Sequence, residues 1–326
     1  MSGPKHFAVA PMMDWTDRHC RVFHRGLTRT ALLYTEMVTA DALLFGPRER
    51  LLAFDPVEHP VALQLGGSDP GRLEAAARMG AAHGYDEINL NVGCPSDRVQ
   101  NGRFGACLMR TPSLVGDLVQ AMQTGAGATP VTVKCRIGVD DQDPETALFD
   151  FVETVARAGC RTFVVHARKA ILAGLSPKEN REIPPLDYDL VKRLKAAHPS
   201  LTILLNGGLA DVPSGLAAAE GLDGIMLGRA AYQNPGVLFD VDPLLAELPA
   251  PTAAREDAVA TYLPYVMRER ARGTPLYPML RPLLGLYAGQ YNGRMWRRVL
   301  SEEGIRPDAD ETVIARALET VTRKAA

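Results

Sequence analysis

Short apolar runs alternate with longer amphipathic stretches along most of the chain. Eight runs of about four to eight residues have the continuous apolar character of parallel strands that are buried on both faces. They span residues 7–12, 32–38, 61–66, 87–92, 131–137, 162–167, 201–206 and 224–227. The stretches between them, such as residues 71–83, 112–124, 143–158 and 186–197, read as helices. Eight such repeats favour a closed (β/α)8 TIM barrel, in which catalytic groups lie at the carboxyl ends of the strands.

The end of the fourth run carries a cysteine between a glycine and a proline. Gly93 permits unusual backbone angles and Pro95 fixes its own φ, so both are expected to hold the Cys94 thiol in one orientation. A thiol in that place could serve as a general acid or as a nucleophile, whereas the other four cysteines are interpreted as buried and inert.

Other predicted strand ends carry polar residues and paired glycines. Lys134 would point into the mouth of the barrel, where burial of a lysine calls for a compensating anion. His166 is either a ligand-facing group or a hydrogen-bonded core histidine. The last two strands end in two glycine-containing turns, Asn206-Gly207-Gly208 and Gly228-Arg229. A tight turn would explain either alone, but two on neighbouring strands favour a phosphate site.

Composition is that of a globular enzyme of 326 residues, with 46% hydrophobic and 23% charged residues. No apolar run approaches the roughly 18 residues that span a bilayer, and no secretory signal is evident, so a cytoplasmic protein without membrane contact is expected. The five cysteines are an odd number without a Cys-x-x-Cys pair. They are therefore expected to be reduced thiols, and no metal site is predicted.

The carboxyl-terminal part differs from the barrel in its charge. A proline-rich stretch at 243–251 reads as a linker, which divides the chain into a barrel domain at 1–242 and a helical domain at 251–326. Residues 268–298 hold seven arginines and one glutamate, although the whole chain has a formal net charge of −2. Arginines interleaved with Tyr277, Tyr287, Tyr291 and Trp296 suit phosphate contacts and base stacking, and a solvated helix face is the alternative.

Four motifs together resemble one known family, the tRNA-dihydrouridine synthases, and in particular the Dus A type. They are residues 11–17 (PMMDWTD), 89–96 (NLNVGCPS), 102–109 (GRFGACLM) and 174–186 (GLSPKENREIPPL). The resemblance covers nearly the whole chain. It implies an FMN-dependent, NADPH-driven reduction of the uracil C5–C6 bond of tRNA, at uridines 20 and 20a of the D-loop. It implies no obligate protein partner.

The resemblance also implies residue roles. Hydride passes from flavin N5 to C6 of the uracil, and Cys94 is expected to give a proton to C5. Asn91 resembles the residue that hydrogen-bonds the target uracil, with an amide that can both donate and accept. The flavin-contacting positions are Pro11, Met12, Met13, Gln64, Lys134 and His166, and the phosphate positions are Asn206, Gly207, Gly208, Gly228 and Arg229. The positions that match tRNA contacts are Lys178, Arg181, Arg294 and Arg297.

Two other functions fit parts of the sequence. A flavin-barrel reductase of a free pyrimidine, of the dihydroorotate dehydrogenase kind, would share the glycine turns and Lys134 but has no use for an arginine-rich helical domain. A non-catalytic tRNA-binding protein would use that domain but not the Cys94 motif. A phosphosugar isomerase fits less well, because only Glu36 and His166 are available as a strand-end pair.

Overall fold

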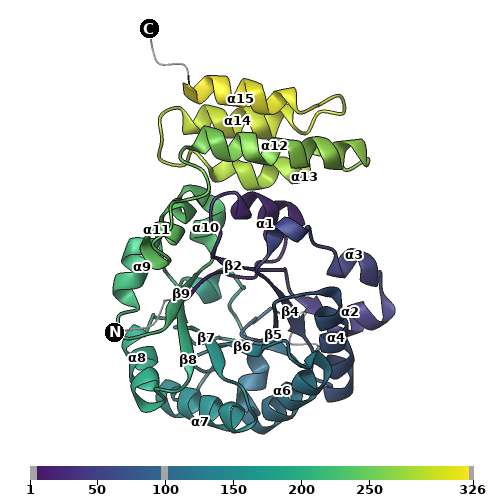
Figure 1. Ribbon diagram of the computed structural model, residues 1–326. Coiled ribbons are helices and arrows are strands. Elements are labelled where there is room, and N and C mark those ends of the chain that lie inside the picture. The colour runs from purple at the N-terminus through teal and green to yellow at the C-terminus, as the bar shows by residue number, and fades with distance from the viewer. Residues whose placement is uncertain (1–5, 97–101, 323–326) are drawn as a thin grey trace.

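The computed structural model describes residues 6–96 and 102–322, and nine strands of this part of the chain form one parallel sheet. The strands are β1 (His6–Val9), β2 (Leu32–Tyr34), β3 (Val38–Thr39), β4 (Val61–Gly66), β5 (Glu87–Val92), β6 (Val131–Arg136), β7 (Thr162–His166), β8 (Thr202–Asn206) and β9 (Gly224–Leu227). β1 pairs with both β2 and β9, and β2 pairs with β4, so the sheet closes on itself. The predicted (β/α)8 barrel is confirmed, and Figure 1 shows it end on.

The first two predicted strands differ from the observed ones. The run at 32–38 is not one strand, because β2 pairs with the start of β4 (Leu33 with Val61) while β3 pairs with its end (Val38 with Leu65). The three residues between them, 35–37, lie opposite only two residues of β4, so the register shifts by one residue there. β1 ends at Val9, so residues 10–12, predicted as strand, belong to the loop that follows.

Helices surround the barrel in the order expected from the sequence (Figure 1). They are α1 (Arg18–Arg25), α2 (Ala40–Phe45), α3 (Arg48–Leu52), α4 (Pro70–His83), α6 (Pro112–Ala126), α7 (Pro144–Arg157), α8 (Tyr188–Ala197), α9 (Val212–Ala218), α10 (Arg229–Gln233) and α11 (Val241–Leu245). Local chemistry sets their limits. In α4 the Asp69 side chain accepts from the backbone N–H of Arg72 at 2.8 Å, and Gly84 ends the helix at φ 98°.

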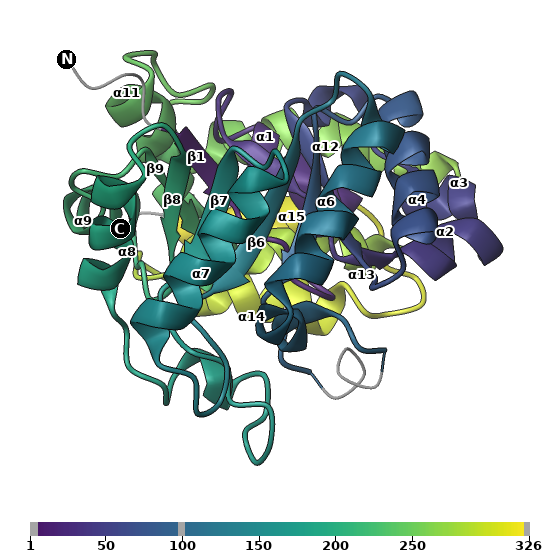
Figure 2. The same ribbon diagram turned by 90° about the horizontal axis from the view of Figure 1, so that it is seen from below.

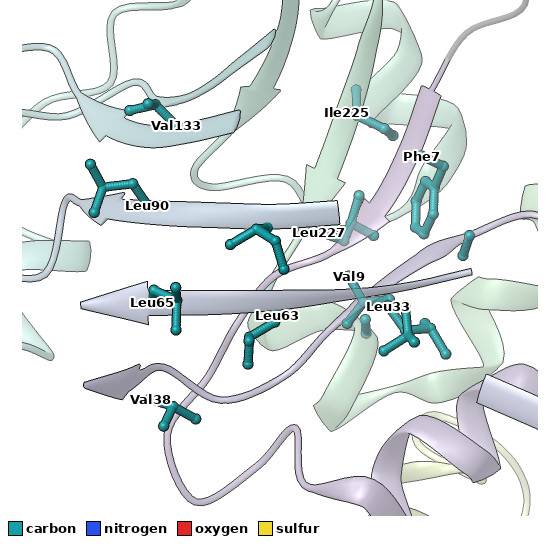
Figure 3. Packing of buried hydrophobic residues seen from close by; sticks show 14 of the residues in the cluster. Phe7, Val9, Leu33, Val38, Leu63, Leu65, Leu90, Val133, Ile225 and Leu227 are labelled. Atoms are coloured by element: carbon teal, nitrogen blue, oxygen red, sulfur yellow. The ribbon is translucent and has the colours of Figure 1, made fainter. Parts of the chain in front are cut away.

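The strands separate two sets of buried side chains. Residues that point outward, such as Leu63, Leu65 and Leu90, pack beneath the helices (Figure 3). Alternate residues point inward, as the period of two requires. A small apolar group fills part of the interior, namely Ala8, Ala10, Tyr34, Ala62, Val164, Leu204 and Met226. β5 and β6 add polar residues to this interior, which is described further below.

The carboxyl-terminal helices form a bundle beside α1 (Figure 1). They are α12 (Arg255–Ala271), α13 (Leu276–Leu280), the 3-10 helix η5 (Arg281–Gly285), α14 (Gly293–Glu303) and α15 (Thr312–Thr322). Trp296 is fully buried in the bundle, and its indole N–H donates to the Leu283 carbonyl at 2.8 Å. Buried Glu269 of α12 forms ion pairs with Arg18 of α1 and with Arg272. Apolar packing is continuous between bundle and barrel, and the predicted limit at 242 falls inside α11.

Candidate active site

A cavity of about 700 Å³ opens at the carboxyl ends of the strands. In the side view of Figure 2, α6 and α7 cover β6 and β7, and the loop after β7 projects beyond the strands. The cavity brings together most of the residues that the sequence singled out, namely Pro11, Met12, Met13, Gln64, Asn91, Cys94, Lys134, His166, Arg181, Asn206, Gly207, Gly208, Gly228 and Arg229. Lys178, Arg294 and Arg297 lie outside it. A cavity of this size is typical of a small-molecule or cofactor site.

The turn after β8 is built for close approach to its backbone. Gly207 has φ 109° and Gly208 has φ 71°, both in the left-handed region that favours glycine. A Cβ on Gly208 would lie 2.5 Å from Leu186 Cδ1, so a larger residue would require the Leu186 side chain to move. The Tyr188 hydroxyl donates to the Gly207 carbonyl at 2.6 Å and fixes the turn. This is the cradle expected of a phosphate-binding turn.

The charge of the cavity is positive. Lys134, Arg136, Arg181 and Arg229 line it, and no aspartate or glutamate does so among the described residues, although Arg229 forms an ion pair with Glu182 at 2.6 Å. Burial, and then Arg136, lowers the pKa of Lys134 from 10.5 to about 8. Within the described chain Lys134 has no ion pair. Such a charge is best compensated by an anionic ligand.

His166 adds a neutral group to this wall. Burial, followed by the nearby Arg136 and Lys134, lowers the pKa of His166 well below its ordinary value, so the imidazole is neutral at pH 7. Its Nδ1 atom is buried and has no hydrogen-bond partner in the described part of the chain. An orphaned ring nitrogen, the glycine cradle and the cationic wall all fit an anionic cofactor with a heteroaromatic ring, as a flavin mononucleotide is.

Cys94 lies in a turn that hydrogen bonds hold in place. The Asn91 Oδ1 atom accepts from the backbone N–H of Gly93 at 3.1 Å and of Cys94 at 3.0 Å, and Arg136 Nε donates to the Gly93 carbonyl at 2.9 Å. The half-buried thiol faces the cavity, 3.4 Å from Ser96 Oγ. Gly93 does not have a positive φ, and a Cβ there would come no closer than 3.6 Å to its neighbours. Gly93 is therefore not required here for a left-handed backbone conformation or for close packing.

Arg136 is a site residue that sequence reasoning did not assign. Besides Gly93, its guanidinium donates from Nη1 to the carbonyls of Lys169 at 3.0 Å and Asn180 at 2.9 Å. Burial lowers its pKa to about 10. It therefore joins the Cys94 turn to the segment that carries Lys178 and Arg181. Its position two residues after Lys134, on the same face of β6, was the available signal.

The loop after β1 is held from both sides, which the sequence did not indicate. Asp14 has φ 63°; its N–H donates to Glu36, and its carbonyl accepts from Arg281 of η5. Trp15 stacks on Tyr232 with ring centroids 4.5 Å apart. The helical bundle thus contacts the loop that carries Met12 and Met13 into the cavity.

The arginine-rich segment divides into structural and free residues. Arg268, Arg272 and Arg298 form ion pairs, and Arg270 and Arg281 donate to backbone carbonyls. Arg294 and Arg297 are exposed on α14 and have no partner among residues 6–96 and 102–322. The prediction that Trp296 and Tyr287 stack on bases is wrong, because Trp296 is fully buried and Tyr287 is 5% exposed. Tyr291, by contrast, is 63% exposed.

Two further classes of site are absent from the described residues. No group of three or more histidine, cysteine, aspartate or glutamate side chains there is placed to hold a metal ion. No helix in that part of the chain has the length and apolar character needed to cross a membrane.

Comparison with known proteins gives a consistent family. Residues 8–324 match the family model described as dihydrouridine synthase (Dus). The chain is 56% identical over 310 residues to the tRNA-dihydrouridine(20/20a) synthase of Xanthomonas campestris pv. campestris, covering 95% of this chain and 92% of the relative. It is 53% identical over 319 residues to the enzyme of that name from Escherichia coli K12, covering 98% and 92%.

A solved structure is similar in fold. The old yellow enzyme homologue from Zymomonas mobilis superposes with a TM-score of 0.52 over 79% of this chain and 92% of that chain, at 11% sequence identity. That identity shows a shared barrel architecture and no more. The family match and the relatives, by contrast, span the barrel and the helical bundle together, and this chain belongs to the dihydrouridine synthase family.

Proposed function

We propose that the protein reduces the C5–C6 double bond of uridines 20 and 20a in the tRNA D-loop to 5,6-dihydrouridine, with FMN as cofactor and NADPH as reductant. The observation that carries the proposal is the placement of a fixed, half-buried thiol in a cationic cavity without carboxylates among its described lining residues. The tRNA substrate is that of the named relatives. NADPH rests on the family resemblance, and a cytoplasmic location follows from a tRNA substrate.

The residues that would hold FMN fall into two groups. Asn206, Gly207, Gly208, Gly228 and Arg229 would bind the phosphate, and Pro11, Met12, Met13, Gln64, Lys134 and His166 would contact the ring. The flavin, when bound, supplies the hydride for C6 of the uracil. Lys134 would stabilise negative charge on the bound ring, because it is a half-buried cation without a protein counter-ion in the described chain.

Cys94 supplies the proton. Addition of a hydride at C6 leaves the pair of electrons of the former double bond at C5, and the saturated product forms when that carbon takes a proton. The neutral His166 imidazole holds no spare proton at pH 7, and Lys134 is expected at the flavin ring. The Cys94 turn, in contrast, is fixed at both its N–H groups and at the Gly93 carbonyl, so the thiol keeps one position.

Presentation of the base is the task of the exposed cations. A uridine stacked in the folded D-loop cannot enter a barrel mouth, so it must be extruded. Arg294 and Arg297 on α14 are available for phosphate contacts because no described residue neutralises them. Arg181 lines the cavity and Lys178 lies three residues before it, so both would be available to a tRNA whose base enters the cavity.

Replacement of Cys94 by alanine tests this assignment. The variant should retain the flavin, its reducibility by NADPH and tRNA affinity, and should lose about 100-fold or more of its turnover. Cys107→Ala is the matched control, because Cys107 is also a half-buried free thiol but bonds the Phe104 carbonyl and does not line the cavity. Wild-type dihydrouridine formation by Cys94→Ala would remove the thiol from the mechanism. Faster turnover of free uridine than of tRNA would instead indicate a free-pyrimidine reductase.

A further inference from the structure

A chain of side-chain hydrogen bonds crosses the interior of the barrel beneath the cavity. Thr132 Oγ1 donates to Glu87 Oε1 at 2.6 Å, and Asn89 Nδ2 donates to Thr132 Oγ1 at 2.8 Å. Gln64 Nε2 donates to Asn89 Oδ1 at 2.8 Å, and Asn91 Nδ2 donates to Gln64 Oε1 at 2.8 Å. The chain ends at the Cys94 turn, where Asn91 Oδ1 accepts the two backbone N–H groups.

Strand register explains why these side chains meet. Gln64, Asn89 and Thr132 are Cα partners on β4, β5 and β6, so they form one layer of the barrel interior. Glu87 lies two residues below Asn89 on β5, and Asn91 lies two residues above it. Asn89 is 0%, Gln64 1% and Thr132 2% exposed. Polar groups so deeply buried are expected to form hydrogen bonds with one another.

The direction of every bond in the chain is fixed by its two ends. Backbone N–H groups only donate, so the Asn91 atom facing them is the oxygen, and its nitrogen faces Gln64. The Gln64 atom facing Asn91 is then its oxygen, and its nitrogen faces Asn89. At the other end Glu87 Oε1 accepts hydrogen bonds from the hydroxyls of both Thr132 and Tyr34, although burial raises the pKa of Glu87. Because the Thr132 hydroxyl donates to Glu87, its oxygen accepts from Asn89. The bonds at both ends agree with one orientation of all three amides.

This orientation decides what the cavity wall offers. Both Gln64 and Asn91 line the cavity, and each has one amide N–H that the chain does not use. The Asn91 oxygen already accepts two bonds, so this residue presents a donor and not the donor–acceptor pair expected from the sequence. A ring carbonyl of a flavin or of a uracil is the complementary group.

We propose that Asn89 and Thr132, which do not line the cavity, are positioning residues for the reaction. They hold the amides of Gln64 and Asn91 as hydrogen-bond donors toward the cofactor and the base, and through Asn91 they hold the Cys94 turn. The inference rests on the proposed function for the identity of what binds, but not for the hydrogen-bond chain itself.

Two substitutions at Thr132 separate the hydroxyl from its packing. Thr132→Val keeps the shape and removes the hydroxyl, whereas Thr132→Ser keeps the hydroxyl and removes a methyl group. In the flavin-loaded protein, Thr132→Val should make the flavin midpoint potential more negative, because a donor to the reduced ring is less well held. In the flavin-free protein, alkylation of Cys94 by iodoacetamide, followed on its own peptide by mass spectrometry, should become about tenfold faster, because a buried partner is lost. Thr132→Ser should match the wild type in both.

Asn89→Leu provides a second variant that removes the acceptor of Gln64 directly, and its two effects should be larger and of the same sign. The proposal would be overturned if Thr132→Val had the midpoint potential and the alkylation rate of the wild type. It would also be overturned if Thr132→Ser changed both values as much as Thr132→Val, because packing alone would then explain the role of the residue. Both readouts need neither tRNA nor NADPH, so a different substrate would leave their outcome unchanged. An active Cys94→Ala enzyme would refute the role of Cys94 as proton donor. The potential and the alkylation rate of the Thr132 variants would still decide the role of Thr132.

Discussion

Lys134 is a positive charge held in the barrel mouth without a protein counter-ion among the described residues, so its replacement by methionine should stabilise the ligand-free protein. Methionine has a similar length and places no charge in the cavity. The same substitution should weaken flavin binding, because the cation is expected to compensate the negative ligand. Stability and function are therefore in opposition at this position.

The pKa of Lys134 sets the size and the pH range of the effect. Its fall from 10.5 to about 8 corresponds to about 3 kcal/mol at about 1.4 kcal/mol for each tenfold change. Below pH 8 the lysine is charged in both states, and the folded state carries the full penalty. Between about pH 8 and 10.5 only the unfolded state keeps the proton, so wild-type stability should rise with pH relative to Lys134→Met.

Urea unfolding of the ligand-free proteins at several pH values measures this difference. Lys134→Met should be more stable by up to about 3 kcal/mol at pH 7, and the difference should shrink as the pH passes 8. Lys195→Met is the control, because Lys195 forms an ion pair with Asp223 at 2.8 Å and should gain no stability on replacement. A difference at Lys134 that is independent of pH, or a less stable methionine variant at pH 7, would refute the reasoning.

Three further substitutions have measurable outcomes. Arg294→Ala combined with Arg297→Ala should weaken tRNA binding and reduce the slope of log affinity against log salt concentration by about 2. Arg298→Ala, which loses only an ion pair with Glu302, should leave this slope nearly unchanged. An unaltered slope in the double variant would exclude phosphate contacts. Trp296→Ala should lower the free energy of unfolding by about 3–5 kcal/mol in urea, and a loss below about 1 kcal/mol would contradict its core role. Arg136→Met should release the Gly93 carbonyl and accelerate alkylation of Cys94, and an unchanged rate would show that Asn91 alone fixes the turn.

The sequence predicted the strands best where burial alone determines them. β4, β5 and β9 have the predicted limits, and a glycine follows each of them, although β5 alternates its apolar residues with Glu87, Asn89 and Asn91. The segment at 32–38 was predicted as one strand, but Thr35 and Glu36 interrupt its apolar residues where β2 ends. Its division into β2 and β3 also depends on the staggered pairing with β4, which local hydrophobicity does not specify.

The site was predictable where a residue type implies its chemistry. Lys134 and the Gly207–Gly208 turn could be inferred from their place at strand ends, and both line the cavity. The hydrogen bonds that hold the Cys94 turn could not be predicted, because they come from the Asn91 side chain and from Arg136 on a neighbouring strand. The arginine-rich segment illustrates the same limit, since composition does not distinguish Arg294, which is free among the described residues, from Arg298, which is paired.

The cavity and the helical bundle are physically one unit, which follows from how Asp14 is held. A non-glycine residue at φ 63° is strained by about 1 kcal/mol or more and persists where its surroundings fix it. One of its two backbone bonds goes to Glu36 of the barrel and the other to Arg281 of the bundle. Removal of the bundle would therefore release the loop that brings Met12 and Met13 to the cavity. The bundle would thus contribute to the proposed reaction in two ways, because it carries the exposed Arg294 and Arg297, which are proposed to contact tRNA, and holds the loop against which the flavin is proposed to pack.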